Sequence, residues 1–309
     1  MLRSALMGMS RSGRVKRLVT TAPVSRGVVA RFVAGESADE ALAVARGLSD
    51  EGLRVSLDRL GEDTTDAEQA AATADAYLDL LKRLDDEGLA PTTEVSLKLS
   101  AVGQTLPGDG ERVALEHAAR VCAAAEAVGT TVTLDMEDHT TTDSTLRVLR
   151  ALRADHPTVG GVLQAYLRRT EQDCRDLATE GSRIRLCKGA YDEPEAVAYR
   201  TRDEVDRSYV RCLKVLMQGD GYPMVATHDP RLVEIATALA VQARRPQGTY
   251  EFQMLHGIRP DEQRRLADVG ETVRVYLPFG TDWYGYLVRR LAERPANVAF
   301  FARSLATRG

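Results

Sequence analysis

Charged and amide side chains interrupt or end most of the short apolar runs in this chain. A single buried polar residue is usually a satisfied hydrogen bonder of the core, but many that converge would be costly to desolvate without a ligand. We therefore expect this polar set to form an active site. Its members are Glu62, Lys98, Asp135, Glu137, Gln164, Arg185, Lys188, Thr227, His228, Glu251, Gln253 and Tyr276.

The stretch RLCKGAY indicates that the site prefers an anionic ligand. Lys188 precedes Gly189 and Ala190, so an amine and backbone amides are offered together to a phosphate or to the edge of a flavin ring. Arg185 and Cys187 are two residues apart and share one face of the expected strand. Cationic donors directed at a flavin would stabilise negative charge on its reduced ring.

Two adjacent arginines lie in the otherwise apolar helical stretch GYLVRRLAE, residues 285–293. At about 100° per residue, Tyr286, Arg289 and Arg290 share one arc of the helix, and Asp282 is the expected N-cap. A solvated face of a surface helix fits this pattern. A paired guanidinium clamp for a small carboxylate fits it as well. The residues alone leave both alternatives open.

Signatures of several other site chemistries are absent from the sequence. Neither an HExxH motif nor a close histidine pair accompanies Asp135, Glu137 and His228, so no metal site is predicted. No GxSxG elbow occurs, and no GxGxxG turn follows an early strand, which argues against one class of hydrolase and against a Rossmann domain. The four cysteines form no CxxC pair, so neither a disulfide framework nor a zinc site is predicted.

The elements that would position the polar set alternate between strands and helices. Strand candidates span residues 28–33, 53–58, 94–100, 131–136, 161–167, 183–188, 223–228, 250–255 and 273–278. Helical patterns span residues 38–49, 66–88, 111–128, 143–154, 170–180, 195–218, 230–244 and 260–269. Repeated βα units within about 250 residues predict an α/β fold, a (β/α)8 TIM barrel with its site at the C-terminal strand ends, which the resemblance described below implies to be distorted. Because nine candidates compete for eight positions, we place VVARFV, residues 28–33, outside the barrel.

Composition limits the classes of partner. The 309 residues carry a net charge of −4, so no nucleic-acid partner is predicted. No apolar run approaches the ~20 residues that span a bilayer, and the expected location is the cytoplasm. Residues 1–35 hold seven cations and no acid. We predict that they form a basic, helical N-terminal arm on a barrel domain of residues 36–309, with peripheral contact at the inner face of the cell membrane as a further hypothesis.

Eight motifs occur in an order that resembles one family. They are EVSLKLSA, LDMED, QAYLRRT, RLCKGAY, ATHDP, YEFQMLHGI, RVYLPFG and YLVRRLAE. In this order they resemble the FAD-dependent proline dehydrogenases, over about residues 31–299, and the length resembles the monofunctional bacterial type. The resemblance implies a barrel whose last helix covers the mouth, so that the arginine pair would face the substrate.

Carried over position by position, the resemblance assigns the site residues to groups. The implied substrate contacts are Lys98, Ala190, Leu255, Tyr276, Tyr286, Arg289 and Arg290. The implied FAD contacts are Met136, Gln164, Arg185, Lys188, Gly189, Ala190, Thr227 and His228. Asp135, near the substrate with Lys98, and Arg185, near flavin N5, are implied to be catalytic, and Glu62 to pair with the first arginine as a gate.

The resemblance also implies the reaction. L-proline would lose hydride from C5 to flavin N5 and become Δ1-pyrroline-5-carboxylate, in the first step of proline catabolism, and a membrane quinone would reoxidise the flavin. A phosphate-binding barrel lyase with Lys98 or Lys188 as a Schiff-base amine is the alternative enzyme class. A carboxylate-binding barrel without catalysis is the third hypothesis.

Overall fold

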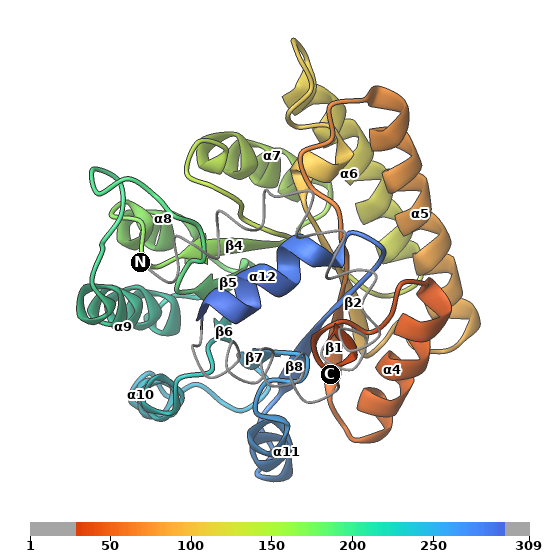
Figure 1. Cartoon of the computed structure of the whole chain (residues 1–309). Helices are drawn as coiled ribbons and strands as arrows, with labels where there is room; N and C mark the ends of the chain where they lie inside the picture. Colours follow the sequence, from red (N-terminus) through yellow and green to blue (C-terminus); the bar gives the residue numbers. More distant parts are fainter. Residues whose placement is uncertain (1–28, 294–309) are drawn as a thin grey trace, which may run out of the picture.

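Eight parallel strands close into a barrel in chain order, with β8 pairing to β1 (Figure 1). The computed structural model describes residues 29–293, except for the side chains of Arg289 and residues 291–293. The strands are β1 (Arg54–Arg59), β2 (Thr93–Leu97), β3 (Val132–Leu134), β4 (Gly160–Gln164), β5 (Arg183–Cys187), β6 (Tyr222–Ala226), β7 (Glu251–Leu255) and β8 (Val273–Phe279). The predicted (β/α)8 barrel is confirmed.

Helices surround the barrel and follow the predicted order. They are α4 (Ala38–Asp50), α5 (Ala67–Asp86), α6 (Gly110–Ala127), α7 (Thr142–Asp155), α8 (Thr170–Leu177), α9 (Arg202–Gln218), α10 (Pro230–Gln242) and α11 (Pro260–Asp268). A short 3-10 helix, η1 (Leu99–Val102), follows β2. The last helix in the described part, α12 (Trp283–Glu293), lies across the end of the barrel instead of in the outer ring (Figure 1).

Two predicted boundaries were wrong. Helix α9 begins at Arg202 and not at residue 195, because Thr201 and Glu204 form a capping box at its start. Residues 28–33 were predicted as a strand, but residues 29–32 are helical, and the amide of Val33 donates to the carbonyl of Val29 at 2.8 Å. The segment does lie outside the barrel, as predicted, because the closed sheet offers no free edge. Residues 1–28 lie outside the described residues, so the boundary at residue 35 stays a prediction.

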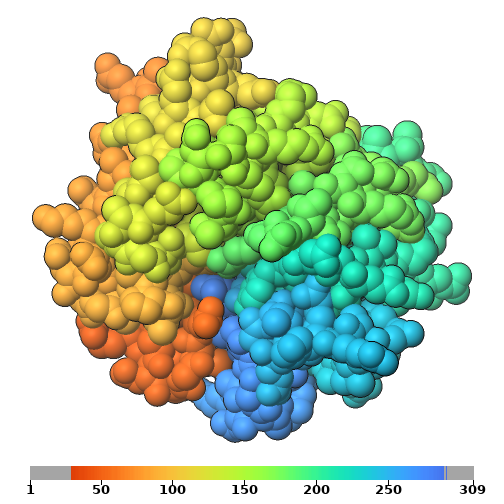
Figure 2. Space-filling model, turned by 180° about the vertical axis from the view of Figure 1, so that it is seen from behind, coloured from red at the N-terminus to blue at the C-terminus, as the bar shows by residue number. Residues whose placement is uncertain are grey.

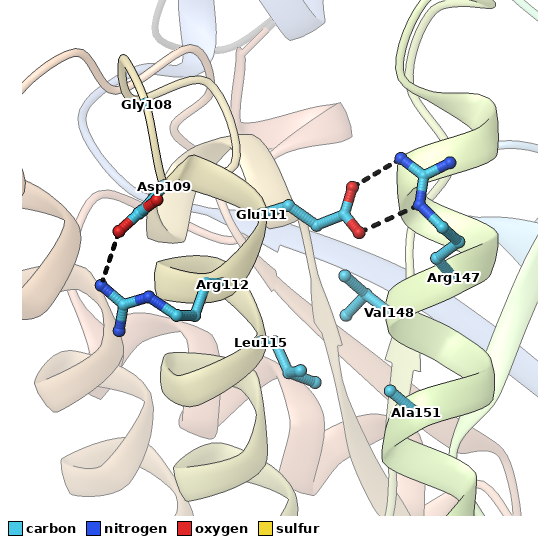
Figure 3. Close-up of a pocket in the computed structure, with 8 residues that line it drawn as sticks. All are labelled: Gly108, Asp109, Glu111, Arg112, Leu115, Arg147, Val148 and Ala151. Atoms are coloured by element: carbon cyan, nitrogen blue, oxygen red, sulfur yellow. Dashed lines mark hydrogen bonds and ion pairs between the residues drawn. The ribbon is translucent and has the colours of Figure 1, made fainter.

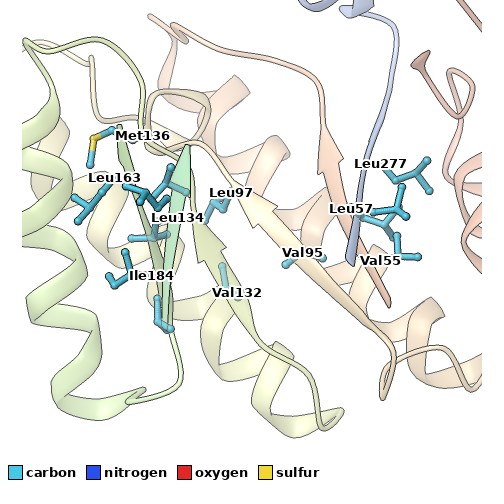
Figure 4. Close-up of a cluster of buried hydrophobic side chains, with 14 of the residues drawn as sticks. Val55, Leu57, Val95, Leu97, Val132, Leu134, Met136, Leu163, Ile184 and Leu277 are labelled. Atoms are coloured by element: carbon cyan, nitrogen blue, oxygen red, sulfur yellow. The ribbon is translucent and has the colours of Figure 1, made fainter. Parts of the chain in front are cut away.

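Alternation along the strands separates an apolar layer from a polar barrel interior. Outward-facing side chains such as Val55, Leu57, Val95 and Leu97 are fully buried between the strands and the helices (Figure 4). Seen from the end of the barrel opposite α12, the surrounding segments close around a small central recess (Figure 2). This layer therefore supplies the hydrophobic stabilisation, and leaves the inner strand faces for charged groups. None of the described helices combines the length and the apolar character needed to cross a bilayer.

Candidate active site

The inner faces of β1, β2, β3 and β8 bring four polar side chains together at the C-terminal end of the barrel. Lys98 Nζ lies 2.6 Å from Asp58 Oδ1 and 3.6 Å from Asp135 Oδ2. Tyr276 Oη donates to Asp135 Oδ2 at 2.6 Å. We call Asp58, Lys98, Asp135 and Tyr276 the upper network. Three of its members were predicted as site residues, and the structure places them in direct contact.

Arg185 joins this network to the middle of the barrel. Its guanidinium donates to Asp135 Oδ1 at 2.8 Å and to Gln253 Oε1 at 2.5 Å. It also donates to Glu94 Oε1 at 3.1 Å, and its charge lies 5.2 Å from the centre of the Tyr276 ring. Because several acceptors hold it, the planar guanidinium of Arg185 has a fixed orientation. A side chain that acts on a bound ring needs such a fixed orientation.

A second set of charges lies toward the N-terminal strand ends. Glu94 Oε2 accepts from Arg183 at 2.7 Å, and Arg274 Nε donates to Glu251 Oε1 at 2.7 Å. Arg274 Nε also lies 3.8 Å from Glu94 Oε1. We call Glu94, Arg183, Glu251 and Arg274 the lower network. The charges of its two acids and two arginines balance. The lower network therefore supports Arg185 from the N-terminal side of the barrel without adding net charge.

Burial and neighbouring charges shift the pKa values of the individual groups in these networks in different directions. Burial raises the pKa of the Asp58 carboxyl, although Lys98 opposes the shift. For Asp135 burial also favours the neutral form, but Lys98 and Arg185 outweigh it and lower the pKa. For Glu94 the three arginines outweigh burial and hold the pKa at about 2. The pKa of Lys98 is raised despite burial, mainly by Asp58, so its amine stays protonated.

Helix α12 brings the substrate residues that were implied by the resemblance to the barrel mouth. Tyr286 is 5% exposed, and the Arg290 guanidinium lies 5.1 Å from the centre of its ring. Arg290 also acts electrostatically on the thiol of Cys187, inside the end of β5. Arg290 is partly buried, which favours the clamp hypothesis over a fully solvated face. The side chain of Arg289 lies outside the described residues. Leu255 packs on the apolar cluster beneath α12.

The residues implied for the cofactor follow β3 to β6. Met136 and Gln164 are in contact, because Gln164 Nε2 donates to the Met136 carbonyl at 3.3 Å. Thr227 Oγ1 accepts from the amide of Asp229, and His228 Nε2 accepts from the amide of Leu255 at 2.9 Å. Since His228 Nε2 is an acceptor there, the hydrogen bond favours the neutral ring with its proton on Nδ1.

Lys188 lies in a separate ion cluster at the same end of the barrel. Its Nζ lies 2.5 Å from Asp206 Oδ1 and 3.3 Å from Asp229 Oδ2. Gly189, next in the chain, has φ 106° and leaves no room for a side chain, because a Cβ there would lie 2.3 Å from the Tyr166 ring. Both Gly189 and Ala190 are partly exposed, so this loop is open to a ligand.

Two acids of the polar set lie at the rim. Glu137 is buried, and accepts from Ser100 Oγ at 2.7 Å and from the Ser100 amide at 3.2 Å. Burial outweighs these bonds and raises the pKa of Glu137 to about 7. Glu62 is exposed, in the segment after β1, and its charge adds to the shift of Glu137. Ser100 Oγ also accepts from the amide of Asp63, so it ties the segment of Glu62 to Glu137.

A hollow on the outer surface lies away from these residues. It has a volume of about 460 Å³ and lies between α6 and α7, where Glu111 and Arg147 form an exposed ion pair (Figure 3). None of the predicted site residues lines it. Across residues 29–293, no group of three or more histidine, cysteine or acidic residues could hold a metal ion.

The sequence analysis missed Asp58, Glu94, Arg183 and Arg274, which complete the two networks. A signal for them exists: polar residues recur every second position in the strands, as Ser56 and Asp58 do in β1. That alternation marks the inner face of a barrel strand, whereas the sequence analysis considered chiefly the strand ends. The lyase alternative gains nothing from the geometry, because a Schiff-base lysine needs a neutral amine and the pKa of Lys98 is raised.

Comparisons with known proteins identify the family of this chain. The family model described as proline dehydrogenase matches residues 41–303. A proline dehydrogenase of Deinococcus radiodurans is 41% identical over 279 residues, covering 89% of each chain. Proline dehydrogenase 1 of Bacillus subtilis is 36% identical over 275 residues, also covering 89% of each chain.

Solved structures show the same fold. The crystal structure of proline utilization A (PutA) from Bdellovibrio bacteriovorus, inactivated by N-propargylglycine, has a TM-score of 0.78 at 26% identity. The match covers 86% of this chain and 32% of that one, so this chain spans about a third of that protein. With a family match over most of its length and relatives above 30% identity, the chain belongs to the proline dehydrogenase family.

Proposed function

We propose that this enzyme oxidises L-proline to Δ1-pyrroline-5-carboxylate with FAD as its cofactor, in the first step of proline catabolism. The observation that carries the proposal is the arrangement of Arg185 and the upper network directly at the barrel mouth that α12 covers. Lys98, after β2, and Arg290, on α12, would supply positive charge for the carboxylate of a small amino acid.

The residues present fit a flavin. Gln164 Oε1 is buried and has no hydrogen-bond partner among the described residues, so it can accept a donor from a bound ring. Gly189 and Ala190 are partly exposed in the loop after β5, so this stretch of backbone is accessible to a bulky ligand. We propose that FAD is held by Met136, Gln164, Arg185, Lys188, Gly189, Ala190, Thr227 and His228. When bound, it supplies the two-electron acceptor for hydride from C5 of proline.

The chain's own residues then bind and orient the substrate. Arg289 and Arg290 hold the carboxylate, with Lys98 as a further cation, and Tyr276, Tyr286, Ala190 and Leu255 shape the pocket around the ring. Asp135 is catalytic in a positional sense, because it fixes the Tyr276 hydroxyl and the Arg185 guanidinium. If proline binds with a neutral amine, the nitrogen lone pair forms the C=N bond as hydride leaves, and no strong general base is needed. Glu62 is proposed to close the site by pairing with Arg289.

Anaerobic titration with proline tests this function. The purified protein should be yellow, and millimolar proline should bleach its flavin absorbance. Arg185→Met should lower the midpoint potential of the bound flavin, because a cation near its reduced form is lost. A flavin spectrum unchanged by proline would contradict the assignment. A covalent adduct trapped by borohydride with substrate would favour a lyase.

We also propose that a membrane quinone reoxidises the flavin, and that the basic arm of residues 1–35 brings the enzyme to the membrane surface. Each cation near an anionic surface contributes about 1 kcal/mol, and salt weakens the attraction. Deletion of residues 1–20 should therefore reduce sedimentation with vesicles that contain phosphatidylglycerol. Equal binding of the full and shortened chains would discard the membrane role of the arm while leaving proline oxidation untouched.

A further inference from the structure

We infer that residues 29–36 form a strap that positions α12 over the barrel mouth, with a hydrogen bond between Glu36 and Trp283 as its polar anchor. This inference rests on the proposed function, in which α12 carries the carboxylate-binding arginines. Glu36 and Trp283 are not among the residues assigned to substrate or cofactor above. They act through α12, so they are positioning residues.

Two backbone hydrogen bonds join the C-terminal end of the strap to the end of β8 and to the residue that follows it. The amide of Ala34 donates to the carbonyl of Pro278 at 2.9 Å, and the amide of Gly280 donates to the carbonyl of Gly35 at 3.0 Å. Gly280 lies three residues before Trp283, the first residue of α12. The strap therefore sets the direction in which the chain enters α12.

The strap also passes close to the loop after β7. A Cβ at Gly257 would lie 1.8 Å from the carbonyl oxygen of Arg31, so the two backbones approach as closely as a glycine allows. Ile258, which follows in that loop, packs in the same apolar cluster as the strap and α12. The strap is thus held from two sides, by β8 and by the β7–α11 loop.

Side chains of the strap cover the buried face of α12. Phe32 and Val33, each 1% exposed, belong to one cluster with Trp283, Tyr286 and other residues of α12. Leu60 and Ile258 are the remaining buried members of this cluster outside the strap and α12. Two of the four buried apolar residues that pack with α12 in this cluster therefore belong to the strap.

The anchor acts on the same helix face as the substrate residues. Trp283 Nε1 donates to Glu36 Oε1 at 2.9 Å. Residues 283, 286 and 290 are spaced i, i+3 and i+7, so they share one face of the helix. Fixing the indole of Trp283 consequently fixes the rotation of α12 that points Tyr286 and Arg290 toward the barrel.

A pair of substitutions at Glu36 tests the anchor in the full-length holoenzyme. Glu36→Ala removes the acceptor and should raise the KM for proline about two- to tenfold, the size of one net hydrogen bond. Its kcat and FAD content should stay near wild type. Glu36→Gln keeps an acceptor oxygen and should restore the KM. Glu51→Ala is the matched control, because Glu51 is also exposed but pairs with Arg264, outside the strap.

Trp283 provides a readout that does not depend on turnover. It is the single tryptophan of the chain, so its fluorescence reports on the first turn of α12 alone. Glu36→Ala should increase acrylamide quenching of this fluorescence, and Glu51→Ala should not. Phe32→Ala should increase both the quenching and the KM further, since it removes a buried contact.

The possible outcomes distinguish a failure of the strap proposal from a failure of the proposed function. A KM and a quenching constant for Glu36→Ala equal to wild type would overturn the strap, and so would equal changes in the Ala and Gln variants. A fall in kcat at constant KM would also overturn it. If wild-type flavin is not reduced by proline, the proposed function fails, while the quenching comparison still decides whether Glu36 holds α12.

Discussion

The upper and lower networks occupy one barrel interior and both pair two carboxylates with cations, but they differ in how completely their charges are compensated. Glu94 in the lower network accepts from Ser56, Thr133, Arg183 and Arg185. Asp58 in the upper network forms one ion pair within the described part of the chain, with Lys98. The pKa of Glu94 is accordingly lowered to about 2, while burial raises the pKa of Asp58.

This difference separates a structural role from a functional one. A buried charge with full compensation holds neighbours in place and has no capacity left for a ligand. A network that is less completely compensated and lies at the barrel mouth leaves charge for a ligand to complete. We propose that the lower network supports Arg185 and that the upper network is the part that changes when substrate binds.

Removal of a lower-network charge should have the largest effect on folding. Glu94→Gln leaves Arg183, Arg185 and Arg274 without their shared carboxylate, and breaking a buried ion pair in this way costs about 3–5 kcal/mol. Urea denaturation followed by circular dichroism should show this decrease in the free energy of unfolding. Glu111→Gln, which removes the exposed partner of Arg147, is the control and should cost about 0–1 kcal/mol. Equal losses in both variants would contradict the role of the lower network.

Glu137, at the rim of the barrel, should make the stability of the fold depend on pH. Because burial raises its pKa to about 7, the folded state holds the proton more tightly than the unfolded state, in which the group has an ordinary pKa. Its contribution to stability is therefore fully present at acidic pH and is lost as the pH rises to about 7, by at most about 1.4 kcal/mol per pH unit and roughly 3 kcal/mol in all. Glu94, with its pKa at about 2, has the opposite sign and loses its contribution as the pH falls toward 2.

Unfolding measured between about pH 4.5 and pH 7 checks this sign. Glu137→Gln is neutral throughout, so the variant should lack the decrease in stability that wild type shows across that interval. Parallel pH profiles for the two proteins would show that Glu137 titrates normally in the fold.

Much of the fold could be predicted from the sequence, because its βα alternation is regular. The eight barrel strands lie within a few residues of their predicted ranges. The start of α9 was missed because its local capping box was overlooked, whereas the wrong strand assignment occurred where tertiary contacts outweigh local pattern. VVARFV has strand-like composition, but Phe32 and Val33 bury against α12, and the closed sheet has no edge for a ninth strand.

The site was predictable in its members and less so in its connections. Lys98, Asp135, Arg185 and Tyr276 were expected at strand ends, and the structure brings all four together. Their partner Asp58 was missed although it alternates with Ser56 along β1, and its pairing with Lys98 depends on the register of β1 and β2, which no local motif encodes. The roles of the cofactor residues came from the family resemblance and remain proposals.

Within the functional part of the molecule, the arginines of α12 should matter most to substrate. Arg290→Lys keeps the charge but loses the planar fork that binds a carboxylate through two donors. We expect kcat/KM for proline to fall by roughly ten- to hundredfold, or about 1.5–3 kcal/mol, with a higher KM and unchanged FAD content. Arg289→Lys should behave alike. Wild-type kinetics in both variants would return the pair to the solvated helix face.

The smallest effect is expected from Tyr276→Phe, which changes one bond of the upper network. The phenyl ring keeps its place beside Arg185, and Asp135 keeps its contacts with Ser96, Arg185 and Lys98. Because three partners remain, losing the hydroxyl donor should cost about 1 kcal/mol, near fivefold in kcat/KM. Steady-state kinetics of Tyr276→Phe and Arg290→Lys, measured together, rank the two contributions. A loss in Tyr276→Phe larger than that in Arg290→Lys would mean that the hydroxyl contacts the substrate itself, and the upper network would then act through Tyr276 more than through its charges.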